Sequence, residues 1–216
     1  MRKKLKYLIL AKLNLNDMIS ENDYHYYLRR TSMLAVKSIA DIIRERTSVK
    51  NGYVNKEISQ ELVLSLLKDA VWAPTHGVRE PWRYIFISGD RKEAFIEEVL
   101  NCNEPSRHEI IRKKFINVPA FLVVVMNQDP RQKVWEEDFA ATSCMIQNLQ
   151  LLAWEQEIGM VWKTPNHIHD PRFRHAIGVA PGEKIVGVLN IGYFDKEIAG
   201  KKIRKRTNPA EKMVAF

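Results

Sequence analysis

Hydrogen-bond donors gather at one short stretch of the sequence, R-T-S-V-K at residues 46–50. An arginine, a serine and a lysine stand there at alternate positions, directly after an apolar helical pattern. If the stretch is extended, Arg46, Ser48 and Lys50 share one side, because successive side chains point in opposite directions. Guanidinium, hydroxyl and ammonium groups suit a phosphate or a similar anion. The alternative is a solvated basic turn, since cations are also favoured after a helix C-terminus.

The loop in A-V-W-A-P-T-H-G-V-R-E-P-W, residues 70–82, carries more chemistry than a connection needs. A single loop histidine such as His76 is usually a surface residue, and no Ser-His-Asp, Cys-His or paired-carboxylate set surrounds it in the sequence. His167 and His169 lack a third ligand at a useful spacing, which argues against a metal site. Anion-binding donors without a catalytic set indicate that a bound cofactor carries the reactive chemistry.

The net charge of +8 is unevenly distributed along the 216 residues: residues 1–50 carry +6, residues 196–216 carry +5, and the residues between them carry −3. Basic ends on a mildly acidic body fit a nucleic acid, an acidic membrane or a smaller anion. The sequence lacks a basic stripe interleaved with aromatic residues, and it lacks helix-turn-helix and zinc-finger patterns. These absences disfavour a nucleic-acid partner.

The basic N-terminus has an apolar run only at Tyr7–Ala11, too short for a signal peptide or a bilayer span. Cys102 and Cys144 form no disulfide framework. We therefore expect a cytoplasmic protein without a membrane partner. Residues 1–35 are predicted to form a helical or partly ordered extension, more typical of a packing arm than of a membrane-surface helix.

Apolar periodicity predicts the elements of the remaining chain. Helices are expected at residues 33–43, 60–73, 90–100, 107–115 and 138–157, with a short helix that begins at Pro171. Strands are expected at residues 83–88, 120–126, 160–163 and 185–194. The helix at 138–157 is apolar nearly all round, which predicts burial inside the domain or in a dimer interface. Together these elements predict an α+β fold with helices covering a mixed or antiparallel sheet of four to five strands. Neither a G-x-G-x-x-G turn nor a P-loop is present, so side chains must hold any phosphate.

Five short motifs in order make the chain resemble the nitroreductase family of flavin enzymes, in particular its small bacterial NAD(P)H nitroreductase subgroup. The resemblance covers Val36 to the C-terminus and sets residues 36–216 apart as the FMN-binding domain. The motifs are R-x-S-x-K at 46–50, A-x-x-A-P-x-H-x-x-x-x-P-W at 70–82, W-E at 135–136, G-x-x-W-K-T at 159–164 and K-I-V-G-x-L-x-I-G at 184–192.

The resemblance implies a nitroreductase-like α+β fold and a domain-swapped homodimer with FMN at the interface. Arg46, Thr47 and Ser48 would bind FMN, with Arg46 and Ser48 towards the phosphate. Lys50 would lie near the ribityl chain or the pyrimidine edge. The loop after Pro74 would reach the flavin of the other subunit.

The resemblance also assigns residues outside the first motif. Trp72 and His76 would contact the cofactor of the other subunit, although Trp72 stands where similar chains carry arginine. The remaining positions would line the FMN of their own subunit, with Lys163 again replacing an arginine; they are Trp162, Lys163, Thr164 and, at the phosphate, Arg206.

The implied function is that of an FMN-dependent oxidoreductase. NADH or NADPH would pass a hydride to flavin N5, and a nitro compound, a quinone or a related small acceptor would then take the same place, which gives ping-pong kinetics. No catalytic side chain is expected. The alternatives are a flavin-storing or regulatory protein with little turnover, and a membrane- or nucleic-acid-associated module built on the basic ends.

Overall fold

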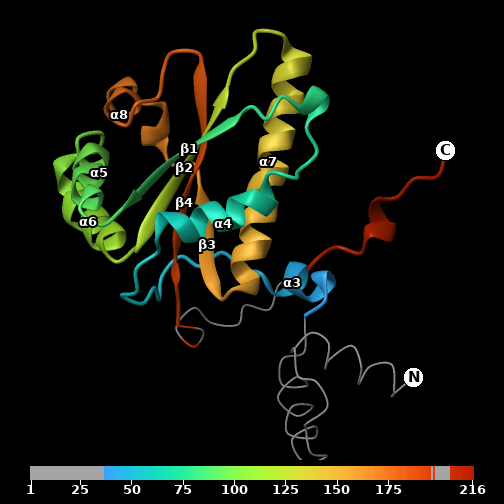
Figure 1. Ribbon diagram of the computed structural model, residues 1–216, viewed down its shortest axis with the longest axis horizontal. Coiled ribbons are helices and arrows are strands. Elements are labelled where there is room, and N and C mark those ends of the chain that lie inside the picture. Colours follow the sequence, from blue (N-terminus) through green and yellow to red (C-terminus); the bar gives the residue numbers. More distant parts are fainter. Residues whose placement is uncertain (1–36, 196, 198–204) are drawn as a thin grey trace, which may run out of the picture. The chain divides into compact units, whose positions relative to one another are not determined.

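The computed structural model describes residues 37–195, residue 197 and residues 205–216 (Figure 1). The predicted N-terminal extension therefore lies outside the described residues. The chain divides into two compact units, Met1–Ala40 and Asp41–Phe216, and the sheet with the helices that cover it belongs to the second unit. A helix was predicted at residues 33–43. The structure has helix α3 at Ile39–Glu45, and residues 33–36 lie outside the described residues.

A four-stranded antiparallel sheet forms the centre of this second unit. The strands are β1 (Trp82–Ser88), β2 (Ala120–Asn127), β3 (Ile158–Lys163) and β4 (Glu183–Tyr193), in the order β1-β2-β4-β3. Every pairing between these strands is antiparallel, so the described residues bear out the antiparallel prediction and not the mixed one. The four predicted strand positions are confirmed within two residues at each end.

Helices α4 (Gln60–Ala70) and α7 (Gln132–Glu155) cover one face of the sheet. Ser59 caps α4, because its side chain accepts a hydrogen bond of 3.2 Å from the Leu62 amide. Helix α4 ends at Ala70, three residues earlier than predicted. The loop after it carries a short 3-10 turn at His76–Val78.

Helices α5 (Arg91–Leu100), α6 (His108–Ile116) and α8 (Pro171–Ala176) lie on the opposite side of the sheet, grouped together in Figure 1. Their core is aromatic: the ring centroid of Phe95 lies 5.0 Å from that of Phe121 and 5.8 Å from that of Phe173. Both faces of β2 are thus buried, which explains its unbroken apolar run. The other 3-10 turns are at Pro105–Arg107, Asn166–His169 and Pro209–Lys212.

Helix α7 differs from its prediction in extent and in burial. It begins at Gln132, six residues before the predicted start. Met145, Leu149 and their neighbours on one side are buried, whereas Ala140 and Cys144 are exposed. Within one copy the helix is therefore buried on one side only. No helix of the described part of the chain is long and apolar enough to cross a bilayer.

Candidate functional site

The donor segment 46–50 runs beside the edge strand β3. The Val49 amide donates a 3.0 Å hydrogen bond to the Met160 carbonyl. Val49 is buried, and a Cβ added to Gly159 would come within 2.7 Å of its Cγ2 atom, so the glycine allows the segment to lie this close. Ser48 and Lys50 are exposed on either side of Val49, in agreement with the predicted alternation.

Arg46 lies at the α7 end of this segment. Its Nη1 atom donates to Oε1 of the buried Gln150 over 3.5 Å, and both Arg46 and the adjacent Thr47 are half-buried. Four extended residues span about 13 Å, so Arg46 and Lys50 mark two ends of a donor edge of roughly that length.

Lys163, the last residue of β3, lies on the α5–α6–α8 side of the sheet. Its Nζ atom is 5.9 Å from the ring centroid of Phe115 in α6. Burial lowers the pKa of Lys163, and the positive charges of Lys114 and Lys50 lower it further. The charges of the predicted residue Lys50 and of Lys114, which the sequence analysis did not single out, thus act on the predicted residue Lys163.

Trp162 points to the opposite face of the sheet from Lys163, as strand alternation requires. Its Nε1–H donates to the Val186 carbonyl over 3.1 Å, and its indole occupies the space that a side chain on Gly187 would need. Trp162 thus packs against β4, and its N–H is already bonded to the backbone. Thr164, which follows β3, is exposed.

His76 lies away from Arg46 in the same copy, whereas Trp72 follows the end of α4, where the Ala70 carbonyl accepts a 3.3 Å hydrogen bond from Asn148 of α7. His76 Nδ1 is 3.8 Å from Oε2 of Glu137, in the first turns of α7, whereas Arg46 meets Gln150. Along α7 these two positions are about 20 Å apart. Trp72 is 86% exposed. One copy of the chain therefore does not join the predicted loop residue His76 to the donor edge.

The arginine of this loop, Arg79, has a structural role that the sequence analysis did not assign. It donates to Asp138 Oδ1 and to Glu137 Oε2, each over 2.8 Å. The hydrogen bond from Arg79 holds the pKa of Glu137 below its ordinary value. Asp138 is buried, so this bridge fastens the loop to α7. No sequence pattern distinguishes such an arginine from a solvated one.

The predicted phosphate residue Arg206 and the histidine His167, at which the sequence argued against a metal site, differ from the donor edge in their surroundings. Arg206 is exposed, and its Nη1 donates to the Lys205 carbonyl, but residues 198–204 before it lie outside the described part of the chain. His167 is buried against Phe173 with a centroid distance of 4.7 Å, and burial lowers its pKa to about 4. Among the described residues, no group of three or more metal-binding side chains is present.

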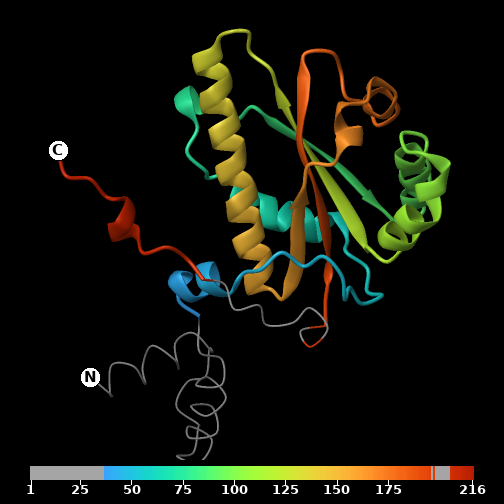
Figure 2. The ribbon, with the colours of Figure 1, turned by 180° about the vertical axis from the view of Figure 1, so that it is seen from behind.

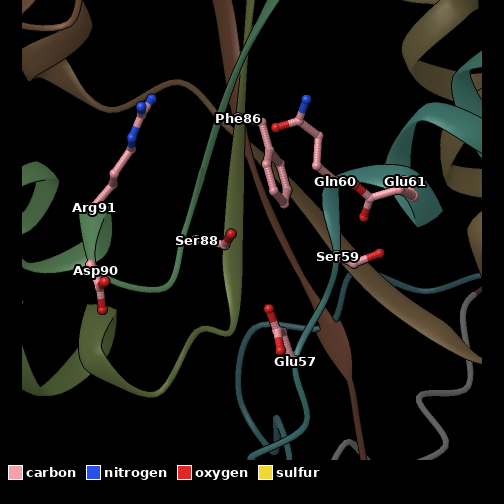
Figure 3. A pocket seen from close by; sticks show the side chains of 8 residues that line it. All are labelled: Glu57, Ser59, Gln60, Glu61, Phe86, Ser88, Asp90 and Arg91. Atoms are coloured by element: carbon pink, nitrogen blue, oxygen red, sulfur yellow. The ribbon is translucent and has the colours of Figure 1, made fainter.

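A cavity of about 460 Å³ lies elsewhere, between the starts of α4 and α5 and the end of β1 (Figure 3). Three carboxylates, those of Glu57, Glu61 and Asp90, face it with one guanidinium, that of Arg91. Its excess negative charge is unsuited to a phosphate, and it contains none of the predicted site residues. The donor edge beside β3 is therefore the better candidate.

The donor edge can be followed in Figure 2, where the segment that leaves α3 crosses β3 towards α5 and α6. The sequence profile described as "Nitroreductase family" matches residues 43–193, which include this edge, the loop and the whole sheet. The chain belongs to the nitroreductase family. The predicted family is thus confirmed, and with it an oxidoreductase of the nitroreductase type.

Individual nitroreductase relatives cover most of the chain. YfhC of Bacillus subtilis, whose name assigns it provisionally to the NAD(P)H nitroreductases, is 36% identical over 177 residues, 78% of this chain and 89% of that protein. A solved nitroreductase-like protein from Bacillus cereus is 41% identical, with a TM-score of 0.79 over 84% of this chain and 97% of that one. A nitroreductase from Desulfovibrio desulfuricans in complex with FMN is 19% identical, with a TM-score of 0.65 over 83% and 97%, and shares the fold.

Proposed function

We propose that the chain is an FMN-dependent NAD(P)H oxidoreductase that reduces nitro compounds, quinones or related small acceptors. The observation that carries this proposal is the donor edge at residues 46–50, held against β3 by the Val49–Met160 hydrogen bond with Lys163 nearby. The FMN in the Desulfovibrio relative and the NAD(P)H in the name of YfhC support the choice of cofactor and reductant. A cytoplasmic location belongs to the same proposal.

The residues present fit FMN by their chemistry. Arg46 and Ser48 would hold the phosphate, each charge-assisted hydrogen bond contributing about 1.5–3 kcal/mol. Lys50 and Lys163 would lie at the pyrimidine edge, where a positive charge favours electron-rich ring atoms. Bound FMN supplies hydride transfer between the nicotinamide and the acceptor, so the chain itself needs no nucleophile.

Partial burial of Lys163 gives its charge a defined position and a drier surrounding. An ammonium group in such a place acts more strongly on a neighbouring ring than a solvated one does, because less water screens it. The exposed Thr164 next to it is free to line the flavin. Trp162 would support the site through its packing on Gly187, with its indole N–H held by the Val186 carbonyl.

A homodimer would complete the site. Within one copy, the contacts of His76 and Arg46 on α7 lie about 20 Å apart, so His76, on the loop after Pro74, reaches the donor edge only from a second copy. Trp72 and Val78 on this loop are 86% and 75% exposed in one copy, as expected for apolar residues that a second copy would cover. Val214 and Phe216 are exposed as well, which suits a domain-swapped C-terminus.

The test is whether the purified protein carries FMN and whether a reduced nicotinamide reduces it. We expect a yellow dimer with one FMN per copy that NADH or NADPH bleaches rapidly in the absence of oxygen, and that an added nitroarene or quinone recolours. A protein that binds FMN but is not bleached would be a storage or regulatory protein instead. Colourless protein that takes up no FMN from excess would contradict the proposal.

A further inference from the structure

One polar side chain interrupts the buried side of α7 where the helix passes the donor edge. Gln150 is 6% exposed, and the residues beside it on the same side of the helix are apolar and fully buried, namely Ile146, Leu149 and Ala153. An apolar residue would continue this pattern, because a buried amide must find hydrogen-bond partners to offset its loss of water. The amide of Gln150 therefore calls for a role other than packing.

The guanidinium of Arg46 is a partner of this amide. Gln150 Oε1 accepts a hydrogen bond of 3.5 Å from Arg46 Nη1. The backbone of Arg46 is fixed at the end of α3, where its amide donates to the Ile42 carbonyl over 2.8 Å. A guanidinium has five N–H donors, and the bond to Gln150 uses one of them. The contact therefore sets the direction of the guanidinium from the buried side of α7.

The acceptor in this contact is neutral, unlike the acceptors of two other arginines in the molecule. Arg79 and Arg83 donate to carboxylates over 2.5–2.8 Å. A carboxylate offsets the charge of the arginine that it binds, and it would compete with a phosphate for the same donors. Gln150 orients Arg46 without adding a negative charge that would repel a phosphate.

We propose that Gln150 is a positioning residue of the flavin site, which directs the guanidinium of Arg46 towards the FMN phosphate and does not itself touch the cofactor. This inference rests on the proposed function, in which Arg46 binds that phosphate. FMN carries the phosphate and riboflavin lacks it. A change at Gln150 should therefore alter the affinity for FMN and leave the affinity for riboflavin nearly unchanged.

The two flavins are compared by titrating apoprotein near neutral pH for the wild type, Gln150→Glu, Gln150→Leu and the control Gln156→Glu. Gln150→Glu places a carboxylate against Arg46 that competes with the phosphate, so FMN should bind about 10- to 100-fold more weakly. Gln150→Leu keeps the charge of Arg46 and removes the acceptor, which should weaken FMN about three- to tenfold. Riboflavin affinity should change by less than about twofold in both variants. Gln156 is exposed after the last turn of α7, so its substitution should affect neither flavin.

A double-mutant cycle separates positioning from a general structural role. Once Arg46→Ala has removed the guanidinium, Gln150→Leu should cause no further loss of FMN affinity, because no guanidinium remains to be positioned. A full further loss in the Arg46→Ala background would overturn the inference. Equal losses of FMN and riboflavin in a folded Gln150 variant would do the same. Gln150→Leu continues the apolar side of α7, so the cycle remains decisive if the buried charge of Gln150→Glu prevents folding.

Failure of the proposed function would look different. Wild-type protein that binds neither flavin would overturn the proposed function, and Arg46→Ala protein that binds FMN as tightly as the wild type would overturn its phosphate assignment. Loss of FMN in Arg46→Ala, together with wild-type FMN affinity in both Gln150 variants, would overturn this inference alone. Urea unfolding of each apoprotein establishes that the compared variants are folded.

Discussion

Charges are arranged differently in two regions of this molecule. Around the start of β1 and of α7 they are matched: Arg83 donates to both carboxylate oxygens of Glu183 over 2.5 and 2.6 Å, and Arg79 bridges Glu137 and Asp138. At the end of β3, by contrast, the positive charges of Lys114 and Lys50 lower the pKa of Lys163, and no carboxylate among the described residues forms an ion pair with Lys163.

The difference separates architecture from binding. The matched region fastens the loop 74–81 and the start of β4 to the body, and its charges are already satisfied. In the cationic region, like charges repel one another, which lowers the stability of the folded protein. Its hydrogen-bond donors remain able to bind a ligand, as expected of a binding site. Substitutions in the matched region should therefore change stability, and those in the cationic region should change flavin binding.

The largest effect is expected from Arg46→Ala combined with Ser48→Ala. Loss of two charge-assisted bonds to the phosphate should weaken FMN binding about 10²- to 10⁴-fold. The protein should still fold and dimerise, since neither side chain belongs to the core. Isothermal titration and size-exclusion chromatography measure the two properties, with Arg44→Ala as the control for charge. Full FMN occupancy in the double variant would refute the phosphate assignment.

The next effect concerns the buried His167 on the α5–α6–α8 side, near the gathered cations. The folded protein protonates it only near pH 4, because burial lowers its pKa, whereas the ordinary pKa is 6.5. The unfolded chain therefore binds the proton first as the pH falls, and stability should decrease between pH 6.5 and 4 by up to about 1.4 kcal/mol per pH unit. Urea unfolding of His167→Phe at pH 6.5 and 5 should show a shallower decrease than the wild type. If the free energy of unfolding decreases equally in the wild type and in His167→Phe between pH 6.5 and 5, His167 is not held neutral.

A smaller effect should follow from Gly159→Ala, which pushes a methyl group into Val49. We expect a loss of about 1–3 kcal/mol in the free energy of unfolding, as for other overpacked sites. Because Val49 holds the donor edge against β3, hydrogen exchange at the Val49 amide should speed up and FMN should bind more weakly. If hydrogen exchange speeds up and FMN affinity does not change, FMN binding does not depend on the packing of the donor edge against β3.

The smallest effect is expected from Arg83→Gln in the matched region. The pair is partly exposed, so its loss should cost at most about 1 kcal/mol near neutral pH. The hydrogen bond from Arg83 keeps the pKa of Glu183 below 4.5, so this stabilisation is present above pH 4.5 and is lost as the pH falls further. FMN affinity should be unchanged. A flavin-binding defect in a fully folded Arg83→Gln protein would blur the distinction between the two regions.

Much of the fold could be predicted because its elements leave strong apolar patterns. The buried run at 120–126 and the capped helix that begins after Ser59 are local signals. The start of α7 was missed, because four of the six residues 132–137 are polar, although Trp135 packs against the core and stacks on Phe139. The strand order could not be predicted, since it depends on pairings between segments far apart in sequence, such as β2 with β4.

The candidate site was predicted in pieces, and the pieces that were missed are charged residues on ordinary-looking elements. Arg79 and Lys114 resemble solvated charges in sequence, and only their neighbours in space distinguish them. The opposite orientation of Trp162 and Lys163 was available from strand alternation, although the resemblance treated them as one group. Flavin titrations of the Arg46 and Ser48 variants decide whether these residues bind the cofactor.

The central claim is that two copies build each flavin site, and complementation between two defective copies tests it most directly. One tagged copy carries Arg46→Ala and Ser48→Ala, and a differently tagged copy carries Trp72→Ala and His76→Ala. Purified through both tags, the heterodimer has one site with all four residues intact and one site lacking all of them. We predict one FMN per heterodimer and little FMN in either homodimer. A heterodimer as empty as the two homodimers, or two copies that never purify together, would contradict the account.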